Sequence, residues 1–197
     1  KVEDNFFETE DLLKIKSVID NHDKLKDLND DNAIIINLNK DFSNYLIHKY
    51  NNKMMNYLNE LNPKKNKLYD YAEISITVSG KNFNYPIHND SLTKILSGVI
   101  YLWPEENIGT IIYDDNKKNP EEVKWKINRA FVFSRKDKST WHSYGSNGIT
   151  TRSAAIFTLR TKKLNRALIV DRGFIIFLIK KIRSFFIKRY INLNDHI

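Results

Sequence analysis

Apolar residues recur at helical spacing in the first third of the chain. Between residues 8 and 28, leucines and isoleucines fall near one helical face, and Thr9 stands where its hydroxyl could cap the first turn. From residue 40 to residue 61 an apolar side chain returns every fourth position, and Pro63 follows. A short β-branched run occupies residues 33–38. The pattern predicts helices over 8–28 and 40–61, with a strand between them.

After residue 67 the pattern changes to an alternation of apolar and polar positions. Turn-forming pairs such as Ser79-Gly80 and Trp103-Pro104 interrupt the alternation at intervals. The expected strands cover residues 68–78, 85–88, 94–102, 109–113, 123–133, 141–144 and 151–159. Short strands at this spacing, with no helix between them, are typical of a sandwich or barrel. Helices first and strands afterwards indicate a mainly β protein of the α+β class.

A single domain with appendages is the expected organisation for 197 residues, of which 41% are hydrophobic and 28% charged. We interpret residues 1–67 as a helical support, residues 68–160 as the β core and residues 161–197 as a C-terminal appendage. The chain has no cysteine, which excludes disulfides, thiolate catalysis and thiolate metal sites. A cytoplasmic location is therefore expected, and histidine and carboxylate remain as the strong metal ligands.

The formal net charge of +8 lies entirely in residues 160–197. Residues 1–159 carry 22 Lys and Arg against 22 Asp and Glu, whereas residues 160–197 carry 10 against 2. A neutral body with one basic appendage argues against a broad phosphate-binding face on the main domain. Nucleic acid is therefore not an expected partner.

The same appendage contains an aromatic-rich apolar run, residues 174–179, followed by several lysines and arginines. Its pattern predicts a basic amphipathic helix within residues 165–191. The apolar run is too short to span a bilayer. Three alternatives stay open: the helix packs on the outer sheet of the domain, lies at the interface of an anionic membrane, or binds a partner or a second copy. The sequence does not indicate the oligomeric state.

His88 and Asp90 are the first candidate metal ligands. They stand two residues apart in a segment expected to be extended, where side chains at i and i+2 point to the same side. Two histidines and one carboxylate on one face of a metal suit Fe(II) oxygen chemistry. A His-x-Asp pair alone is expected roughly 0.4 times by chance in this composition, so a second histidine is required. Within the β region that histidine is His142.

Arg152 is the next candidate functional residue. It lies in a predicted strand, residues 151–159, that is otherwise made mostly of small and apolar residues. A buried arginine is costly unless a carboxylate pairs with it. That carboxylate belongs either to an Asp or Glu of the protein or to a bound ligand. The place of Arg152 shortly after His142 favours a ligand.

The order His88, Asp90, His142, Arg152 resembles that of the 2-oxoglutarate and Fe(II)-dependent dioxygenases, and most closely their prolyl-hydroxylase-like branch. The resemblance covers about residues 68–160. It extends to Tyr85, to a strand ending in Tyr101-Leu102 and to the Gly109–Tyr113 strand. The chain departs from the family pattern at Trp103-Pro104, where Asn is usual after Tyr-Leu, and at Gly109-Thr110, where Gly-Gly is common.

This resemblance implies a double-stranded β-helix, or jelly-roll, that holds iron through His88, Asp90 and His142. It further implies that 2-oxoglutarate chelates the iron and that Arg152 binds its distal carboxylate, assisted by the Tyr101 hydroxyl. Tyr85 lies beside the cofactors or packs against them. The implied activity is hydroxylation, with dioxygen consumed and succinate and CO2 released. The substrate, a small molecule or a protein side chain, is not identified.

Two alternatives remain beside the oxygenase. A cupin-like metal-binding protein would use the same barrel and the same three ligands without 2-oxoglutarate. A non-catalytic jelly-roll binding module would use His88 and His142 as structural residues. Loss of 2-oxoglutarate binding on substitution of Arg152 distinguishes the oxygenase from the first, and metal-free folding with intact partner binding would support the second.

Overall fold

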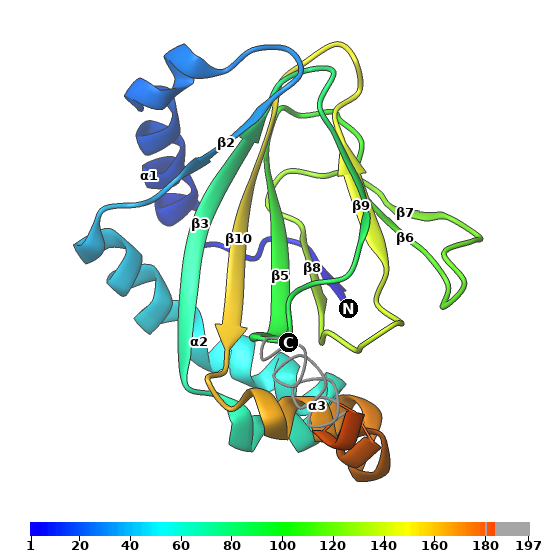
Figure 1. The fold of residues 1–197 in the computed structure, drawn as a ribbon. Coiled ribbons are helices and arrows are strands. Elements are labelled where there is room, and N and C mark those ends of the chain that lie inside the picture. The colour runs from blue at the N-terminus through cyan, green and yellow to red at the C-terminus, as the bar shows by residue number, and fades with distance from the viewer. Residues whose placement is uncertain (180, 184–197) are drawn as a thin grey trace, which may run out of the picture.

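The computed structural model describes residues 1–179 and 181–183. Two antiparallel sheets face each other, and helices α1 and α2 lie on the outer side of the larger sheet (Figure 1). The larger sheet has the strand order β1-β8-β5-β10-β3-β2, and the smaller has the order β4-β9-β6-β7. This arrangement confirms the predicted α+β class.

The order of the strands across each sheet differs from their order in the chain. The larger sheet consists of β1 (Val2–Glu3), β8 (Ala130–Phe133), β5 (Lys94–Trp103), β10 (Arg152–Arg160), β3 (Tyr71–Ser79) and β2 (Ala33–Ile36). The smaller sheet consists of β4 (Asn84–His88), β9 (His142–Gly145), β6 (Thr110–Ile112) and β7 (Glu121–Val123). The helices are α1 (Thr9–Asp20), α2 (Lys40–Leu61) and α3 (Leu164–Arg172), with 3-10 turns η1 (Asp23–Asp27) and η2 (Pro63–Leu68).

Strand β10 lies in the middle of the larger sheet, antiparallel to β5 on one side and to β3 on the other. Its alternate residues Ala155, Phe157 and Leu159 are fully buried in the main hydrophobic core. Because side chains alternate along a strand, the residues between them face the smaller sheet. One face of β10 therefore builds the core, and the other faces the space between the sheets.

Helix α2 covers the outer face of the larger sheet, and its bounds are those predicted. Asn39 caps its first turn by accepting a hydrogen bond at 2.8 Å from the amide three residues on. Leu46, Met54 and Leu58 are completely buried, and each such side chain contributes about 2 kcal/mol. Gly98 of β5 allows the helix to approach, since a Cβ there would lie 3.2 Å from Met54 Cε.

The helix predicted over residues 8–28 is shorter in the structure. Helix α1 ends at Asp20, and His22 then caps the 3-10 turn η1 by accepting a hydrogen bond from a backbone amide two residues on. Thr9 was expected as the cap, but it is the first helical residue, and the side chain of Glu8 at the cap position makes no capping hydrogen bond to the first turn. A local side-chain acceptor therefore competes successfully with continuation of the helix.

The single strand predicted over residues 123–133 is wrong, because the segment crosses from one sheet to the other. Strand β7 of the smaller sheet ends at Val123, and strand β8 of the larger sheet begins at Ala130. Asn128 between them adopts a left-handed conformation with φ of 60°. Its amide side chain exchanges two hydrogen bonds of 2.8 Å with the backbone of Phe7. This turn also anchors the N-terminal segment.

The N-terminal region provides both edges of the larger sheet as well as helices. β1 pairs with β8 at one edge, and β2 pairs with β3 at the other. An unpaired sheet edge exposes backbone donors and acceptors, and short terminal strands limit that exposure. Residues 1–67 thus belong to the same folded unit as the β core.

Helix α3 attaches the C-terminal appendage to the 3-10 turn η2, not to the outer sheet. Ala167 is buried at this contact. Asp171 is 2% exposed and forms ion pairs with Lys65, at 2.7 Å, and with Arg135. Burial lowers the pKa of the Lys65 ammonium, and the charge of Asp171 opposes that effect. The root of the appendage is therefore fixed by a buried charge cluster.

Helical conformation resumes after Gly173 and covers residues 174–179 and 181–183. The remainder of the amphipathic helix predicted within residues 165–191, namely 180 and 184–191, lies outside the described residues. Among the described residues, no helix is both long and apolar enough to cross a bilayer.

Asp171→Asn is expected to lower the free energy of unfolding by about 3 kcal/mol, because it leaves the buried Lys65 and Arg135 without their shared anion. Urea denaturation measures the difference. The matched control is Asp23→Asn, which breaks the exposed pair with Lys26 and should cost less than about 0.5 kcal/mol. Equal effects of the two substitutions would contradict a stabilising role for the buried cluster.

Candidate metal centre and cosubstrate cavity

The three predicted metal ligands come together between the sheets. His88 is the last residue of β4 and His142 the first of β9, and the two are direct partners across the antiparallel pair. Their ring centroids are 4.2 Å apart. Asp90 follows β4 by two residues, and one ligand atom from each of the three lies within 4.8 Å of the others. Strand register therefore builds a compact cluster of two imidazoles and one carboxylate.

Both imidazoles are oriented by backbone carbonyls. His88 Nδ1 lies 3.0 Å from the carbonyl oxygen of Pro86, and His142 Nδ1 lies 3.0 Å from that of Thr140. A carbonyl accepts only, so each Nδ1 carries the proton and each Nε2 keeps its lone pair for a metal. Burial lowers the pKa of His142, which keeps this imidazole in the neutral form that binds metals.

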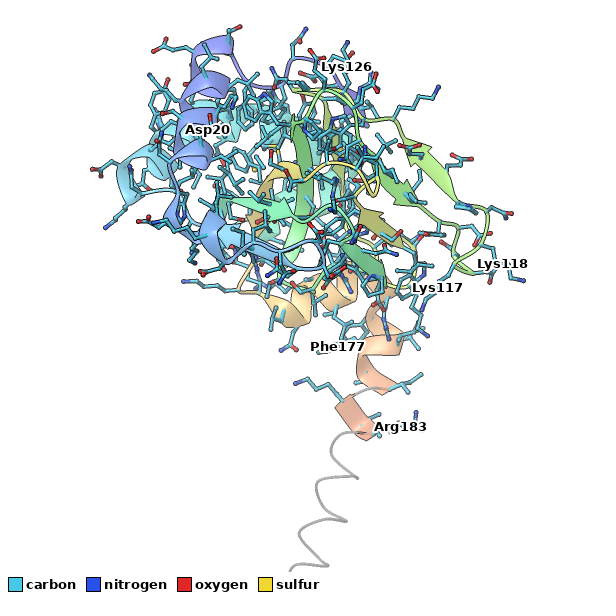
Figure 2. All side chains as sticks on the ribbon, turned by 90° about the horizontal axis from the view of Figure 1, so that it is seen from above. Asp20, Lys117, Lys118, Lys126, Phe177 and Arg183 are labelled. Atoms are coloured by element: carbon cyan, nitrogen blue, oxygen red, sulfur yellow. The ribbon has the colours of Figure 1, made fainter. Side chains whose placement is uncertain are left out.

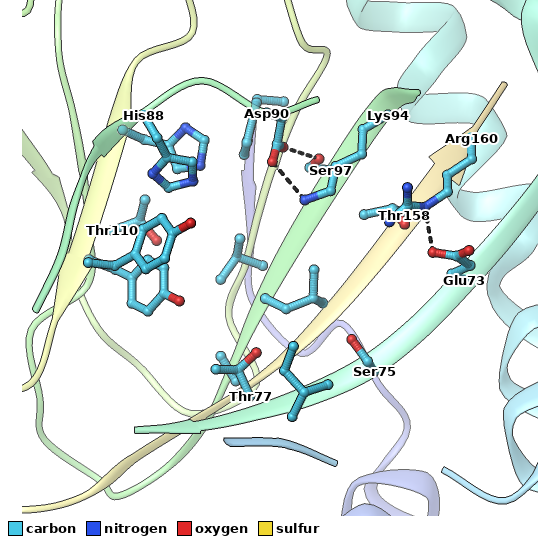
Figure 3. Close-up of a pocket in the computed structure, with 18 of the residues that line it drawn as sticks. Glu73, Ser75, Thr77, His88, Asp90, Lys94, Ser97, Thr110, Thr158 and Arg160 are labelled. Atoms are coloured by element: carbon cyan, nitrogen blue, oxygen red, sulfur yellow. Dashed lines mark hydrogen bonds and ion pairs between the residues drawn. The ribbon is translucent and has the colours of Figure 1, made fainter. Parts of the chain in front are cut away.

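Asp90 is 8% exposed and is held on both carboxylate oxygens (Figure 3). Lys94 Nζ lies 2.7 Å from Oδ1, and the Ser97 hydroxyl donates to Oδ2 at 2.5 Å. Arg135 Nε donates to the backbone oxygen of Asp90 at 2.9 Å. Burial raises the pKa of the Asp90 carboxyl, but Lys94 and Ser97 together outweigh it, and the net pKa is below the ordinary value. The carboxylate is therefore charged and fixed in place.

Arg152 begins β10 and is 3% exposed. Its guanidinium carbon lies 4.8 Å from the ring centroid of Tyr144 and 5.1 Å from that of Trp125. Burial lowers the pKa of Arg152 to about 10, so the group is still a cation at neutral pH. No carboxylate of the described residues pairs with it, and its Nε and Nη2 have no hydrogen-bond partner there. The alternative of a structural salt bridge finds no support in this part of the chain.

Thr110 supplies a second unsatisfied polar atom near Arg152. Its Oγ1 is buried without a hydrogen-bond partner among the described residues, and both residues line the same cavity. Buried polar groups normally have partners, so two such groups in one cavity indicate a polar ligand. An arginine fork beside a hydroxyl suits a carboxylate.

The hydroxyl of Tyr101 is already engaged within the protein. It donates to the Val123 carbonyl at 3.1 Å and accepts from the Thr110 amide at 2.7 Å. Tyr101 is completely buried, stacks on Trp125 and is not part of the cavity's described lining. Its predicted assistance to the cosubstrate stays a prediction. The observed contacts make it a support for the strand that carries Thr110.

Tyr85 lies on the cavity side of the smaller sheet. Its ring packs edge-on against His88, with centroids 4.5 Å apart, and stacks on Tyr144 at 5.2 Å. These contacts involve the ring of Tyr85, which limits the movement of the His88 imidazole. A direct role for Tyr85 in cofactor binding stays a prediction.

A cavity of about 330 Å³ connects these groups with a polar region on the opposite side of the metal ligands (Figure 3). That region is formed by the inward-facing residues of β3, β5 and β10. They include three hydroxyl-bearing residues and one ion pair of 2.5 Å, namely Ser75, Thr77, Thr158 and the pair Arg160–Glu73. The volume is that of a small-molecule site.

The sequence interpretation missed Thr110, Tyr144 and Lys94 as cavity residues. Tyr144 follows His142 by two positions, so the same rule of strand alternation that joined His88 to Asp90 would have found it. Lys94 and Thr110 carried no such signal, because only the facing of the two sheets brings β5 of the larger sheet and β6 of the smaller sheet to the site.

No family model matches the chain, and no curated protein matches it in sequence. Solved structures do match in fold. A prolyl-4-hydroxylase from Pseudomonas putida has a TM-score of 0.60 at 14% identity, over 82% of this chain and 92% of its own. A prolyl hydroxylase from Trichoplax adhaerens, in complex with a hypoxia inducible factor peptide fragment, has a TM-score of 0.63 at 14% identity, over 85% and 86%.

A 2OG-Fe(II) oxygenase family protein from Burkholderia pseudomallei has a TM-score of 0.53 at 11% identity, over 79% of this chain and 80% of its own. The chain therefore has the fold of prolyl hydroxylases and 2OG-Fe(II) oxygenases, which confirms the predicted double-stranded β-helix. At these identities the comparisons establish the fold. The chemistry depends on the residues of this chain.

Substitution of His142 by Ala is expected to weaken Co(II) or Fe(II) binding by about 100-fold, because two ligands remain of three. Anaerobic calorimetric titration gives the affinity. His48→Ala is the control, since His48 is exposed on α2, and it should bind metal as the unmodified protein does. Metal affinity that is the same in both variants would exclude the cluster as the metal centre.

Proposed function

We propose that this protein is a non-haem Fe(II), 2-oxoglutarate-dependent oxygenase that hydroxylates its substrate. One observation carries the proposal: a His-Asp-His cluster shares a cavity with a buried arginine that has no carboxylate partner in the described chain. The cluster fits a metal with open coordination positions, and the arginine fits an anion. A five-carbon dicarboxylate with a keto group satisfies both.

The donor set supports iron as the metal. Two neutral imidazoles and one carboxylate leave coordination positions open for a chelating ligand and dioxygen, which is the arrangement of Fe(II) oxygenases. His88, Asp90 and His142 would hold the ion. When bound, iron would supply the oxidation that converts 2-oxoglutarate and dioxygen to succinate and CO2 and hydroxylates the substrate.

The environment of Arg152 supports 2-oxoglutarate as the cosubstrate. The aromatic faces of Tyr144 and Trp125 hold the planar guanidinium, and its burial strengthens any charge pair it forms. The Thr110 hydroxyl would donate to the same carboxylate. Arg152 and Thr110 thus orient the distal end of the cosubstrate while the metal ligands receive its keto end.

The protein's own residues also control protons and water at the site. The Nδ1 atoms of His88 and His142 each lie against a backbone carbonyl, which leaves each Nε2 to face the metal. Asp90 keeps its charge through Lys94 and Ser97. Phe133 packs against His142 with ring centroids 4.8 Å apart and excludes water from that side.

The two alternatives predict different behaviour of the same residues. In a cupin-like protein without 2-oxoglutarate, or in a binding module with structural histidines, a buried arginine with no anion would only cost stability. The oxygenase gives that arginine a partner, which is why we favour it. Two of the neighbours are named as prolyl hydroxylases. The substrate of this chain stays unidentified, whether a small molecule or a protein side chain.

A cytoplasmic site of action is part of the proposal, supported by the absence of cysteine. Cell fractionation of the producing organism would check it, and recovery outside the cytoplasm and its membrane surface would contradict it. The neutral charge of residues 1–159 supports a partner other than nucleic acid.

Anaerobic addition of Fe(II) and 2-oxoglutarate to the protein is expected to produce a metal-to-ligand charge-transfer absorbance band. Admission of oxygen should then release succinate, measured by chromatography. Absence of both band and succinate, with iron shown to be loaded, would overturn the oxygenase. Metal binding without 2-oxoglutarate affinity would favour the cupin-like alternative, and stable folding without metal affinity would favour the binding module.

Arg152→Gln is expected to weaken 2-oxoglutarate binding by about 100-fold while leaving Fe(II) affinity unchanged, because only the distal carboxylate loses its cation. The charge-transfer titration reports both affinities. Arg160→Gln, on the same face of the same strand but paired with Glu73, is the matched control for cosubstrate affinity. If the two variants lost 2-oxoglutarate equally, Arg152 would not be the specific partner.

A further inference from the structure

The described residues that follow Gly173 form an exposed apolar surface, which we call the tail segment (residues 174–179 and 181–183). Six of its large apolar side chains are between 46% and 74% exposed: Phe174, Ile175, Ile176, Leu178, Ile179 and Ile182. Scattered apolar residues on a surface need no explanation, but a contiguous group of this kind marks an interaction site.

The tail segment is directed away from the domain by its attachment. Asp171 and Arg172, at the end of α3, are held by ion pairs to Arg135 and Asp137. Gly173 then adopts φ 85° and ψ 158°, a conformation essentially restricted to glycine. The chain therefore leaves a fixed root at a defined turn. Figure 2 shows Phe177 and Arg183 beyond the body of the domain.

Basic residues accompany the apolar ones. Residues 180–189 contain three lysines and two arginines and no acidic residue, in a protein whose residues 1–159 are neutral. Within the tail segment Lys181 Nζ lies 5.8 Å from the Phe177 ring centroid, so its stem follows the apolar surface while its charge stays at the edge. Apolar side chains beside a row of cations are the composition of helices that lie in a membrane interface.

We propose that the tail segment docks the protein on the surface of an anionic lipid bilayer. Charge complementarity favours an anionic membrane over a second copy of the chain as the binding partner. A second copy would bring two sets of five cations together, which repel each other, whereas anionic headgroups neutralise them. The outer sheet is already covered by helices α1 and α2, and the turn at Gly173 leads the segment away from it.

The docking is peripheral. No helix in the described ranges is long and apolar enough to cross a bilayer, and the tail segment offers its apolar side chains to the interface only. This proposal is independent of the oxygenase chemistry, because lipid binding requires neither iron nor 2-oxoglutarate. The segment is connected to the metal site through Arg135, which contacts both Asp171 and the Asp90 carbonyl.

Co-sedimentation of the full chain with vesicles tests the proposal. Vesicles of phosphatidylcholine with one quarter phosphatidylglycerol should bind the protein at low salt, and pure phosphatidylcholine should bind it much less. The double substitution Ile175→Ser and Ile179→Ser removes two exposed side chains and should reduce the partition coefficient at least about tenfold. Ile149→Ser, 78% exposed in a different region, is the matched control and should change nothing.

A second variant tests the electrostatic contribution to vesicle binding. Lys181→Gln with Arg183→Gln should weaken binding to the anionic vesicles by about 25-fold, because each cation near such a surface contributes about a fivefold factor. Far-ultraviolet circular dichroism and Co(II) affinity equal to those of the unmodified protein would show that every variant is folded. Failure to bind anionic vesicles overturns the proposal, as does equal binding to both kinds of vesicle. A dimer abolished by the serine substitutions, without vesicle binding, also overturns it in favour of a second copy.

Discussion

The antiparallel pairing of β4 with β9 is the interaction on which the site depends. It places His88 directly opposite His142, and Asp90 lies two residues beyond the end of β4. In a sheet, a shift of one residue turns every side chain to the other face. Such a shift in either strand would remove one imidazole from the cluster. The aromatic contacts of Tyr85 with Tyr144 lie on the same pair of strands and help to hold this register.

A second constraint is the accommodation of buried charge. Near the site, the buried carboxylates of Asp90 and Asp171 are surrounded by Lys94, Lys65 and Arg135. Arg135 belongs to both groups, because it pairs with Asp171 and donates to the Asp90 carbonyl. The root of the C-terminal appendage is therefore part of the framework that positions a metal ligand. Arg152 is the exception to this compensation among the described residues, which makes it the residue that most directly indicates a ligand.

The fold and the site support different parts of the functional conclusion. Structures with 11% to 14% identity share the two-sheet architecture, and that similarity defines the class of fold. The proposed chemistry depends instead on three ligands and one arginine of this chain. The cavity also has a polar region beyond Asp90, with the pair Arg160–Glu73 and several hydroxyls. The residues that form this region are read from this chain itself, and the neighbours' names say nothing about them.

Local patterns in the sequence determined α2, whose bounds and core face follow from apolar residues every fourth position, and most strands of the two sheets. The candidate ligands were also predicted from the sequence, because His88 and Asp90 stand two residues apart and the β region contains one further histidine, His142. Local patterns did not predict that residues 123–133 divide between two sheets. The turn between the two strands is held by hydrogen bonds between Asn128 and Phe7, which are far apart in sequence. Local patterns also could not predict that Arg152 has no carboxylate partner among the described residues, or that the Tyr101 hydroxyl is bonded within the protein. Contacts between distant segments decide these features, and a local pattern contains no information about which distant group will fill a given space.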